Sequence, residues 1–214
     1  MKVQAMNPDV VVFNVFGTLL KCERHHQPYL RLMKWAHQNG LQSHTVDLKS
    51  FMLRPGGRQE AATWLGMSPP NTLLSEWNDE LQANIRSIQC YPEVLPTLAR
   101  LRQLGYRIGL CSNLAESYGI SVQNQLPILD SCVFSYQVGA LKPQREIYRA
   151  LLDGLACPAG RVLFVGNSPQ EDVLGPRSFG MKARFLARWK WDLDEVLGDL
   201  LAGRGIFTST NSTT

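Results

Sequence analysis

Apolar residues near the N-terminus follow one another almost without interruption and predict a buried strand. The stretch from Val10 to Leu20 reads V-V-V-F-N-V-F-G-T-L-L and contains no charge. A continuous apolar run rich in β-branched residues is typical of a strand covered on both faces. Gly17 and Thr18 open a turn, because Gly permits φ > 0 and lets backbone N–H groups approach a ligand. The pattern therefore predicts a strand that presents Asn14 at its carboxyl end, where open α/β sheets bind ligands.

The hydrophobic period changes between Glu23 and Gln89, where apolar residues recur at helical spacing. They include Tyr29, Leu30, Met33, Trp35, Ala36 and Leu41, then Ala61, Ala62, Trp64 and Leu65, then Leu73, Leu74, Trp77, Leu81, Ile85 and Ile88. The spacing predicts helices throughout this segment and no strand. We interpret it as a helical cap inserted after the first strand, with its three tryptophans in the cap's own core.

From Tyr91 onward, short apolar runs alternate with helical patterns. The runs predict strands at 107–111, 132–135, 162–165 and 183–186, and the patterns predict helices near 92–104, 143–155, 169–179 and 193–201. Regular alternation of strand and helix indicates a parallel sheet with helices on both faces. The predicted fold is therefore α/β, a Rossmann-like parallel sheet core with the helical cap inserted into it. The core domain would be residues 1–21 and 90–207, the cap domain 22–89, and the Ser- and Thr-rich tail 208–214 disordered.

Composition and charge exclude several function classes. The chain has 22 Lys and Arg against 18 Asp and Glu, with no block of like charge, so no nucleic-acid patch is indicated. No apolar run is long enough to span a bilayer, and the N-terminus does not resemble a signal peptide. The five cysteines are widely spaced and form no C-x-x-C pair, which favours a reducing compartment. We therefore expect a cytoplasmic protein that binds neither nucleic acid nor membrane.

Polar residues follow the predicted strands and should gather at one edge of the sheet. They are Asn14, Ser112, Asn113, Lys142, Asn167 and Asp172. Ser168, Pro169 and Glu171 have the pattern of a helix start with a capping box. The neighbouring His25 and His26 would point apart on a helix, so we expect no metal there.

These polar stretches resemble, in order and spacing, the four motifs of the haloacid dehalogenase-like (HAD) hydrolase superfamily. The first strand and its turn are similar to the first motif, and Ser112-Asn113 after R-I-G-L-C to the second. Lys142 in G-A-L-K-P is similar to the third motif, and F-V-G-N-S-P-Q-E-D to the fourth. The resemblance covers the whole expected folded chain and implies the HAD fold.

The resemblance also implies roles for individual residues. The catalytic positions would be Asn14, Phe16, Ser112 and Lys142, where the family has a nucleophilic Asp at position 14 and its phosphatases have an acid at position 16. Substrate contacts would come from Gly17, Thr18, Ser112, Asn113 and Lys142. The Mg²⁺ positions would be Asn14, Phe16, Asn167 and Asp172, of which only Asp172 keeps a carboxylate. Because Mg²⁺ prefers carboxylate oxygens, we expect weak binding of this ion at best.

Three hypotheses about function follow. The first is a HAD-like hydrolase acting on a small phosphoester or related anion, impaired because an amide is a poor nucleophile and Phe16 cannot donate a proton. The second is a catalytically silent binding or regulatory protein on the same scaffold. The third is metal-independent dehalogenase-type chemistry, which an aromatic residue at position 16 resembles but which also requires the missing carboxylate at position 14.

Overall fold

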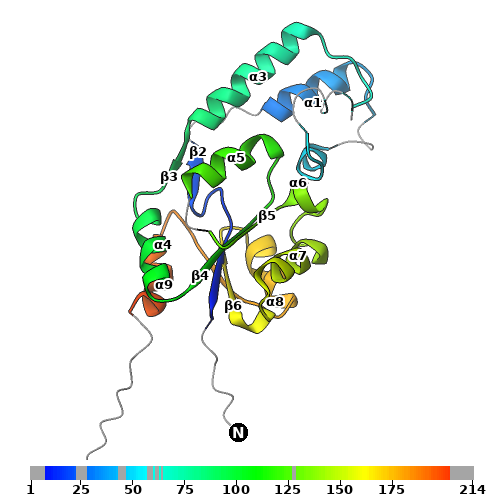
Figure 1. Ribbon diagram of the computed structural model, residues 1–214. Coiled ribbons are helices and arrows are strands. Elements are labelled where there is room, and N and C mark those ends of the chain that lie inside the picture. The colour runs from blue at the N-terminus through cyan, green and yellow to red at the C-terminus, as the bar shows by residue number, and fades with distance from the viewer. Residues whose placement is uncertain are drawn as a thin grey trace, which may run out of the picture.

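A sheet of five parallel strands forms the centre of the protein, in the order β5-β4-β1-β6-β7 (Figure 1). The computed structural model describes residues 8–22, 28–42, 47–56, 60, 63, 65–126 and 129–202. The strands are β1 (Val10–Phe13), β4 (Arg107–Ser112), β5 (Ser131–Phe134), β6 (Val162–Gly166) and β7 (Lys182–Phe185). The sheet confirms the predicted α/β class.

The central strand β1 is buried on both faces because its side chains alternate between two separate cores. Val11 and Phe13 pack into one core, and Val10 and Val12 into the other. Helices α4 (Val94–Gln103), α5 (Glu116–Gln125) and α9 (Leu193–Leu201) contribute to the first core. Helix α7 (Arg145–Leu155) and the π-helical segment η3 (Pro169–Leu174) contribute to the second. The uninterrupted apolar run therefore reflects burial on both sides.

The connectivity brings three strand ends together. Strand β1 pairs with β4 on one side and with β6 on the other, and the chain continues outward to β5 and β7 in opposite directions. The carboxyl ends of β1, β4 and β6 therefore meet where the strand order reverses, the place where open α/β sheets bind ligands.

A cap lies over this edge of the sheet, at the top of Figure 1. Its described elements are α1 (Pro28–Gln38), the 3₁₀ turn η1 (Leu48–Met52) and α3 (Asn71–Arg86). They share a small core that includes Leu32, Met33, Phe51, Trp77 and Leu81. Trp77 is thus a core residue, as expected, whereas Trp64, His25 and His26 lie outside the described residues. The domain boundaries given above stay a prediction.

A two-stranded antiparallel ribbon joins the cap to the core. It consists of β2 (Leu20–Cys22) and β3 (Ile88–Cys90), with Leu20 opposite Cys90 and Cys22 opposite Ile88. The prediction that the segment up to Gln89 contains no strand was therefore wrong. Ile88 continues the helical spacing of α3 in sequence, but α3 ends at Arg86 and Ile88 pairs across to the start of the cap.

Several core elements differ from the predicted boundaries. The apolar pattern predicts no element for α5, nor for the short helix α6 (Ser135–Val138) that replaces the end of the expected strand at 132–135. The helix expected at 169–179 is η3 followed by the short α8 (Gly175–Ser178). A 3₁₀ turn, η2 (Ala159–Arg161), precedes β6. The tail 208–214 lies outside the described residues.

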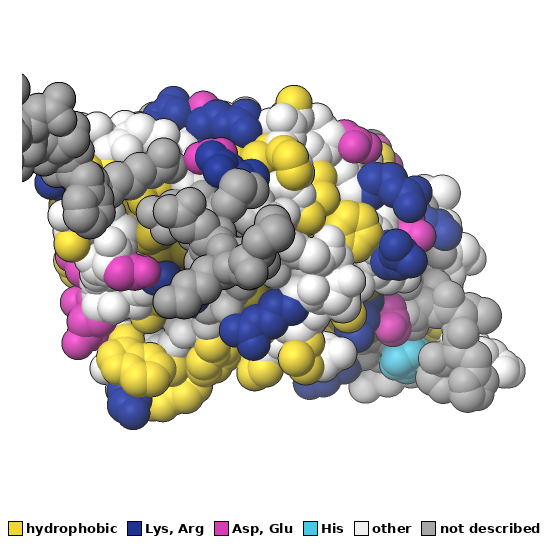
Figure 2. All heavy atoms as spheres, turned by 90° about the horizontal axis from the view of Figure 1, so that it is seen from below, with side chains coloured by type: hydrophobic (Ala, Val, Ile, Leu, Met, Phe, Trp, Pro, Cys, Tyr) yellow, Lys and Arg dark blue, Asp and Glu magenta, His cyan; other side chains and the backbone are white. Residues whose placement is uncertain are grey.

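Charged side chains of both signs occur together on the face of the molecule drawn in Figure 2. Partly exposed ion pairs of the protein include Arg184–Asp199 and Arg102–Asp130. In the parts of the chain that the structure describes, none of the helices combines the length and the apolar character needed to cross a bilayer.

Candidate functional site

Side chains from three neighbouring strands meet at the switch point of the sheet. Asn14 follows β1, Ser112 ends β4 and Asn167 follows β6. The Ser112 hydroxyl donates to Asn14 Oδ1 at 2.9 Å, and Asn14 Nδ2 donates to Asn167 Oδ1 at 2.8 Å. Lys142, from the loop after α6, donates to the same Asn14 oxygen at 3.0 Å. The structure thus brings four of the sequence-predicted residues into one hydrogen-bonded cluster.

Asn14 uses its whole hydrogen-bonding capacity in this cluster. Its Oδ1 accepts from Ser112 and Lys142, and its Nδ2 donates to Asn167 Oδ1 and, at 3.0 Å, to the backbone carbonyl of Phe16. The partners fix the orientation of the carboxamide, because an ammonium group only donates and a carbonyl oxygen only accepts. The oxygen of Asn14 therefore faces Lys142, and its NH₂ group faces the Phe16 carbonyl.

Lys142 and Asp172 form a fully buried ion pair under Asn14. Their side chains are 1% and 0% exposed, and Lys142 Nζ lies 2.6 Å from Asp172 Oδ1. The ammonium group also donates to the Cys111 carbonyl at 3.0 Å, and Ser168 N donates to Asp172 Oδ2 at 2.9 Å. Each partner is thus hydrogen-bonded beyond the pair itself, as a buried charge requires. The charges of Lys142 and Asp172 balance, so the cluster is close to neutral.

Asn113, predicted to contact substrate, is hydrogen-bonded to the backbone of Lys142 on both sides of its carboxamide. Its Oδ1 accepts from Lys142 N at 2.8 Å, and its Nδ2 donates to the Lys142 carbonyl at 3.1 Å. The peptide bond between Lys142 and Pro143 is cis. The two hydrogen bonds link the end of β4 to the loop before α7, so Asn113 positions the lysine.

The turn after β1 packs against Asn167. Gly17 has φ +72°, and a Cβ at this position would lie 2.5 Å from Asn167 Nδ2. The buried Thr18 hydroxyl donates to Asn167 Oδ1 at 3.1 Å. Gly17 and Thr18, both predicted to contact substrate, therefore shape the turn and orient Asn167. Arg188 Nε reaches the Thr18 carbonyl at 3.0 Å from outside the turn.

The four positions assigned to Mg²⁺ do not fit this ion as they are arranged. The Asn14 NH₂ group donates to the Phe16 carbonyl and to Asn167 Oδ1, so two oxygens that could bind a cation bind amide hydrogens instead. Both oxygens of the remaining carboxylate, Asp172, are engaged by Lys142 and Ser168. Among the residues that the structure describes, no three His, Cys, Asp or Glu side chains group as metal ligands.

The fourth motif stretch begins η3 with only half of the expected capping box. Ser168 Oγ accepts from Glu171 N at 3.3 Å. The Glu171 carboxyl interacts with Asn113 rather than with the backbone of Ser168, and burial raises its pKa. Tyr148 donates to the Glu171 carbonyl at 2.6 Å and adds a second anchor to this turn. A half-buried carboxyl thus lies beside the lysine loop, which the sequence pattern did not indicate.

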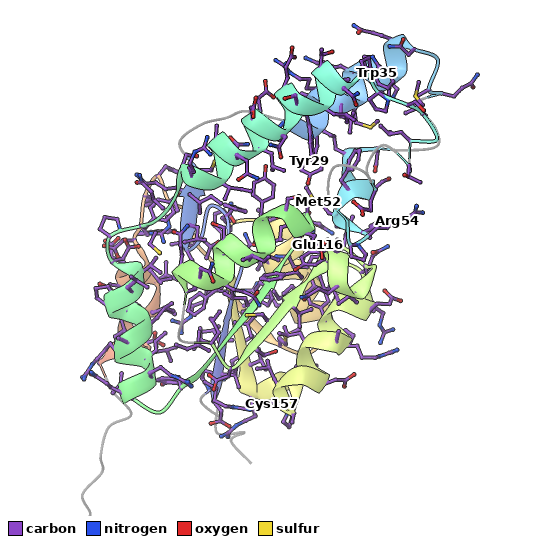
Figure 3. The ribbon with its side chains drawn as sticks, turned by 45° about the horizontal axis from the view of Figure 1, so that its top comes forward. Tyr29, Trp35, Met52, Arg54, Glu116 and Cys157 are labelled. Carbon is purple, nitrogen blue, oxygen red and sulfur yellow. The ribbon has the colours of Figure 1, made fainter. Side chains whose placement is uncertain are left out.

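A pocket of about 420 Å³ lies between the cap and the carboxyl edge of the sheet. Figure 3 shows Tyr29 and Met52 on the side of the cap that faces α5, with Glu116 at the start of that helix. The walls are mainly apolar and include Phe16, Tyr29, Leu48, Phe51, Met52 and Tyr118. Phe16 and Asn113 also line it, and both are hydrogen-bonded to the polar cluster around Asn14, so the pocket lies beside that cluster.

Two hydrogen bonds connect the cap to α5 beside this pocket. Tyr29 donates to Ser117 Oγ at 3.1 Å, and Asn84 Nδ2 donates to the Tyr118 hydroxyl at 3.4 Å. Burial raises the pKa of Tyr29 to about 12. The sequence pattern missed Ser117 and Tyr118, since it predicts no helix for this segment. Their position shortly after the Ser112-Asn113 pair was the available signal that they lie near the site.

The family model of the haloacid dehalogenase-like hydrolases matches residues 8–180 of this chain. The match spans most of the chain, and we conclude that the protein belongs to this family. The glyceraldehyde 3-phosphate phosphatase of Methanothermobacter thermautotrophicus is 33% identical over 101 residues, covering 44% of this chain and 42% of that protein. The (S)-2-haloacid dehalogenase 4A of Burkholderia cepacia is 28% identical over 105 residues, covering 48% and 45% respectively. The chain spans about half the length of the curated relatives it matches.

Solved structures of the family share the fold. A HAD phosphatase from Thermococcus onnurineus superposes with a TM-score of 0.63 at 21% identity, covering 93% of this chain and all of that chain. A HAD family enzyme from Bacteroides thetaiotaomicron, solved in complex with magnesium and inorganic phosphate, superposes with a TM-score of 0.64 at 16% identity, covering 88% and 98%. At these identities the similarity establishes the HAD fold of the chain.

Proposed function

We propose that this protein binds a small phosphoester or related anion at the carboxyl edge of its sheet and hydrolyses it poorly. One observation carries the proposal. The group at the centre of the site, Asn14, is a neutral carboxamide whose oxygen accepts from Ser112 and Lys142, and whose nitrogen donates to Asn167 and Phe16. The donors that could hold an anion are therefore present, while the carboxylate that attacks in the family is absent.

Ser112 and Lys142 are the groups that would bind the anion. A hydroxyl and an ammonium group both donate, and both already converge on one oxygen atom of Asn14. A phosphoryl or carboxylate oxygen offers the same kind of acceptor with more charge, which strengthens such hydrogen bonds. Asp172 holds the Lys142 ammonium group in place through its 2.6 Å contact.

Asn14 and Phe16 account for the low activity. A carboxamide has no anionic form near neutral pH and is a poor nucleophile, so a covalent intermediate on residue 14 would form slowly. Phe16 carries no proton for a leaving alkoxide. Loss of a nucleophile costs hydrolases about 10³-fold or more in turnover. In the limit of no turnover, the protein is a binding or regulatory member of its family.

Weak affinity for Mg²⁺ is part of this proposal. The NH₂ group of Asn14 bridges the Phe16 carbonyl and the Asn167 carboxamide, and both oxygens of Asp172 are engaged by other groups. A cation could bind there only after these hydrogen bonds break. We therefore expect the anion to bind without a divalent cation.

The protein's five cysteines support a cytoplasmic location within the same proposal. All five are free, and Cys111 is buried with a pKa that burial raises to about 12. Free, unreactive thiols are typical of a reducing compartment. The proposed partner is a small anion rather than a nucleic acid or a membrane.

The test compares hydrolysis of p-nitrophenyl phosphate by the unmodified protein and by Asn14→Asp and Asn14→Asp/Asn167→Asp, each with Mg²⁺ and with EDTA. We expect the double variant with Mg²⁺ to be about 10³-fold faster than the unmodified protein. Asn124→Asp makes the same chemical change at an exposed position of α5 and should have no effect. Intact mass confirms that position 14 of the unmodified protein is still Asn.

The unmodified protein could instead turn over the substrate as fast as the double variant. If that activity were lost in Ser112→Ala and Lys142→Met, the proposal of impaired catalysis would be overturned. A calorimetric titration with inorganic phosphate, in EDTA, tests anion binding separately. No binding at millimolar phosphate would contradict the proposed role of Ser112 and Lys142.

A further inference from the structure

The pocket next to the polar cluster is built almost entirely from apolar side chains. Phe16 and Tyr118 come from the core, and Tyr29, Leu48, Phe51 and Met52 come from the cap. No Lys, Arg, Asp or Glu is among the described residues that line it. A ligand that enters this pocket meets no second charged group there.

Several polar side chains at the pocket wall already have hydrogen-bond partners. The Tyr29 hydroxyl donates to Ser117, the Tyr118 hydroxyl accepts from Asn84, and the Asn113 carboxamide holds the Lys142 backbone. A hydroxyl-rich ligand would therefore leave water and find few new hydrogen bonds, which is unfavourable. An apolar group has no hydrogen bonds to water to lose, and it would bury apolar surface in the pocket.

Two residues of the pocket wall are hydrogen-bonded to the cluster that holds the proposed anion-binding donors. Phe16 lines the pocket with its ring, and its carbonyl accepts from Asn14 Nδ2. Asn113 lines the pocket and is hydrogen-bonded to Lys142, whose Nζ lies 3.0 Å from Asn14 Oδ1. An anionic group held by Ser112 and Lys142 would thus direct the rest of its molecule between the cap and α5.

We propose that the ligand is a small anion with a compact apolar body, aromatic or branched aliphatic, and not a polyhydroxylated phosphate. This inference rests on the proposed function, because the anion is placed at Ser112 and Lys142. The volume of about 420 Å³ lies within the usual range of small-molecule sites, roughly 300–1,000 Å³. Three aromatic side chains, Tyr29, Phe51 and Tyr118, line the pocket and would contact such a body.

The test is a calorimetric titration of the full chain with four probes. They are inorganic phosphate, phenylphosphonate, the hydrophilic 2,3-dihydroxypropylphosphonate and neutral benzyl alcohol. We expect phenylphosphonate to bind about tenfold or more tighter than either inorganic phosphate or the dihydroxypropyl compound, the usual gain for one apolar group in a fitting pocket. Comparable or tighter binding of the hydrophilic phosphonate would overturn the proposal.

Variants of the pocket lining distinguish binding of the apolar body from binding of the anionic group. Met52→Gln replaces a half-buried lining residue by a polar one of similar length, and Leu48→Gln does so at a more exposed position that folding should tolerate. Both should weaken phenylphosphonate by about tenfold and leave inorganic phosphate unchanged. Met67→Gln is the matched control, because Met67 packs in the cap core but does not line the pocket. Equal effects of Met52→Gln and Met67→Gln would contradict the proposal.

The probes also distinguish failure of this inference from failure of the proposed function. If inorganic phosphate binds and phenylphosphonate binds no more tightly, only the proposal of an apolar body is overturned. Absence of binding by every anion would sink the proposed function. The anionic ligand proposed here would be overturned with it, and benzyl alcohol binding that Met52→Gln abolishes would then show an apolar site without an anion site.

Discussion

The side-chain nitrogen of Asn14 donates a hydrogen bond to the carboxamide oxygen of Asn167 across 2.8 Å, although 153 residues separate the two in sequence. The motif resemblance predicts that each amide stands where the family has an aspartate. Two carboxylates at this separation would repel each other unless a cation lay between them. The two amides are hydrogen-bonded to each other directly, so the pair needs no cation between them.

Restoring both carboxylates should therefore create a dependence on Mg²⁺. In EDTA, Asn14→Asp/Asn167→Asp groups three carboxylates around one lysine, and we expect a loss of about 1–3 kcal/mol in the free energy of unfolding. Mg²⁺ at about fifty times its Kd should raise the free energy of unfolding of the double variant by about 2 kcal/mol. Thermal unfolding with and without Mg²⁺ measures both effects. The melting temperatures of the unmodified protein and of Asn124→Asp should not change with Mg²⁺. A comparable rise in either would refute the idea that the amide pair needs no cation.

Lys142→Met should be among the most destabilising substitutions in the core. It leaves the Asp172 carboxylate, which is 0% exposed, without its cationic partner, and breaking such a buried pair costs about 3–5 kcal/mol. Lys142→Met/Asp172→Asn should cost clearly less than the sum of the single changes. Urea unfolding measures these free energies. Arg31→Met is the control, because it removes ion pairs with Glu76 and Glu80 near the surface and should cost about 1 kcal/mol or less. Similar losses of stability in Lys142→Met and Arg31→Met would argue against the buried pair.

Gly17→Ala should be costly for two reasons. Its φ of +72° disfavours any side chain, and the new Cβ would lie 2.5 Å from Asn167 Nδ2. Gly66→Ala is a close control, since its φ is +63° and nothing lies within 4 Å of its Cβ position. Both share the conformational cost of about 1–2 kcal/mol, and Gly17→Ala should exceed it by about 1 kcal/mol more, as measured by urea unfolding. Equal losses would mean that Asn167 is not held against the turn.

Stability at high pH should depend on Tyr29. Burial raises its pKa from 10.0 to about 12, so the folded state favours the neutral phenol. The contribution of the neutral Tyr29 phenol to folding stability is fully present below pH 10 and is lost as pH rises through 12. NMR titration of ¹³C-labelled tyrosine rings, assigned with Tyr29→Phe, should show this late ionisation.

Unfolding experiments check the same linkage independently. Between pH 10 and pH 12, the unmodified protein should lose stability relative to Tyr29→Phe, which has no phenol to ionise. Near pH 7, Tyr29→Phe should cost about 1 kcal/mol, because it removes the hydrogen bond to Ser117. A stability difference that does not change with pH would show that the phenol of Tyr29 is not shielded by the cap.

The sequence predicted the sheet and the gathering of its polar strand ends well, for a physical reason. A strand buried on both faces, such as β1, needs an unbroken apolar run, and Val10–Phe13 is visible without any knowledge of its neighbours. Helix α5 was missed because its segment E-S-Y-G-I-S-V-Q-N-Q carries few apolar positions, and only Gly119 and Val122 in it are buried. Ile88 was misplaced because its spacing from Ile85 fits a helix, whereas its strand pairing depends on a partner 66 residues earlier.

Side-chain partners could not be predicted in the same way. Asn113 follows a strand at the edge where ligands bind, which suggests a ligand contact. Its carboxamide also holds the backbone of Lys142, a partner that only the folded chain brings within 3 Å. The Thr18 hydroxyl likewise donates to Asn167, which lies 149 residues away in sequence. Local patterns identify the residues of the site, and the tertiary structure decides which of them face each other.

The ribbon of β2 and β3 has a consequence for the architecture of the cap. Cys22 and Ile88 are directly opposite each other, and opposed residues of antiparallel strands have Cα atoms about 5 Å apart. The 65 intervening residues therefore leave and re-enter the core at neighbouring positions. A tight hairpin could replace that entire excursion, or a different excursion could be grafted there, while every strand of the parallel sheet keeps its neighbours.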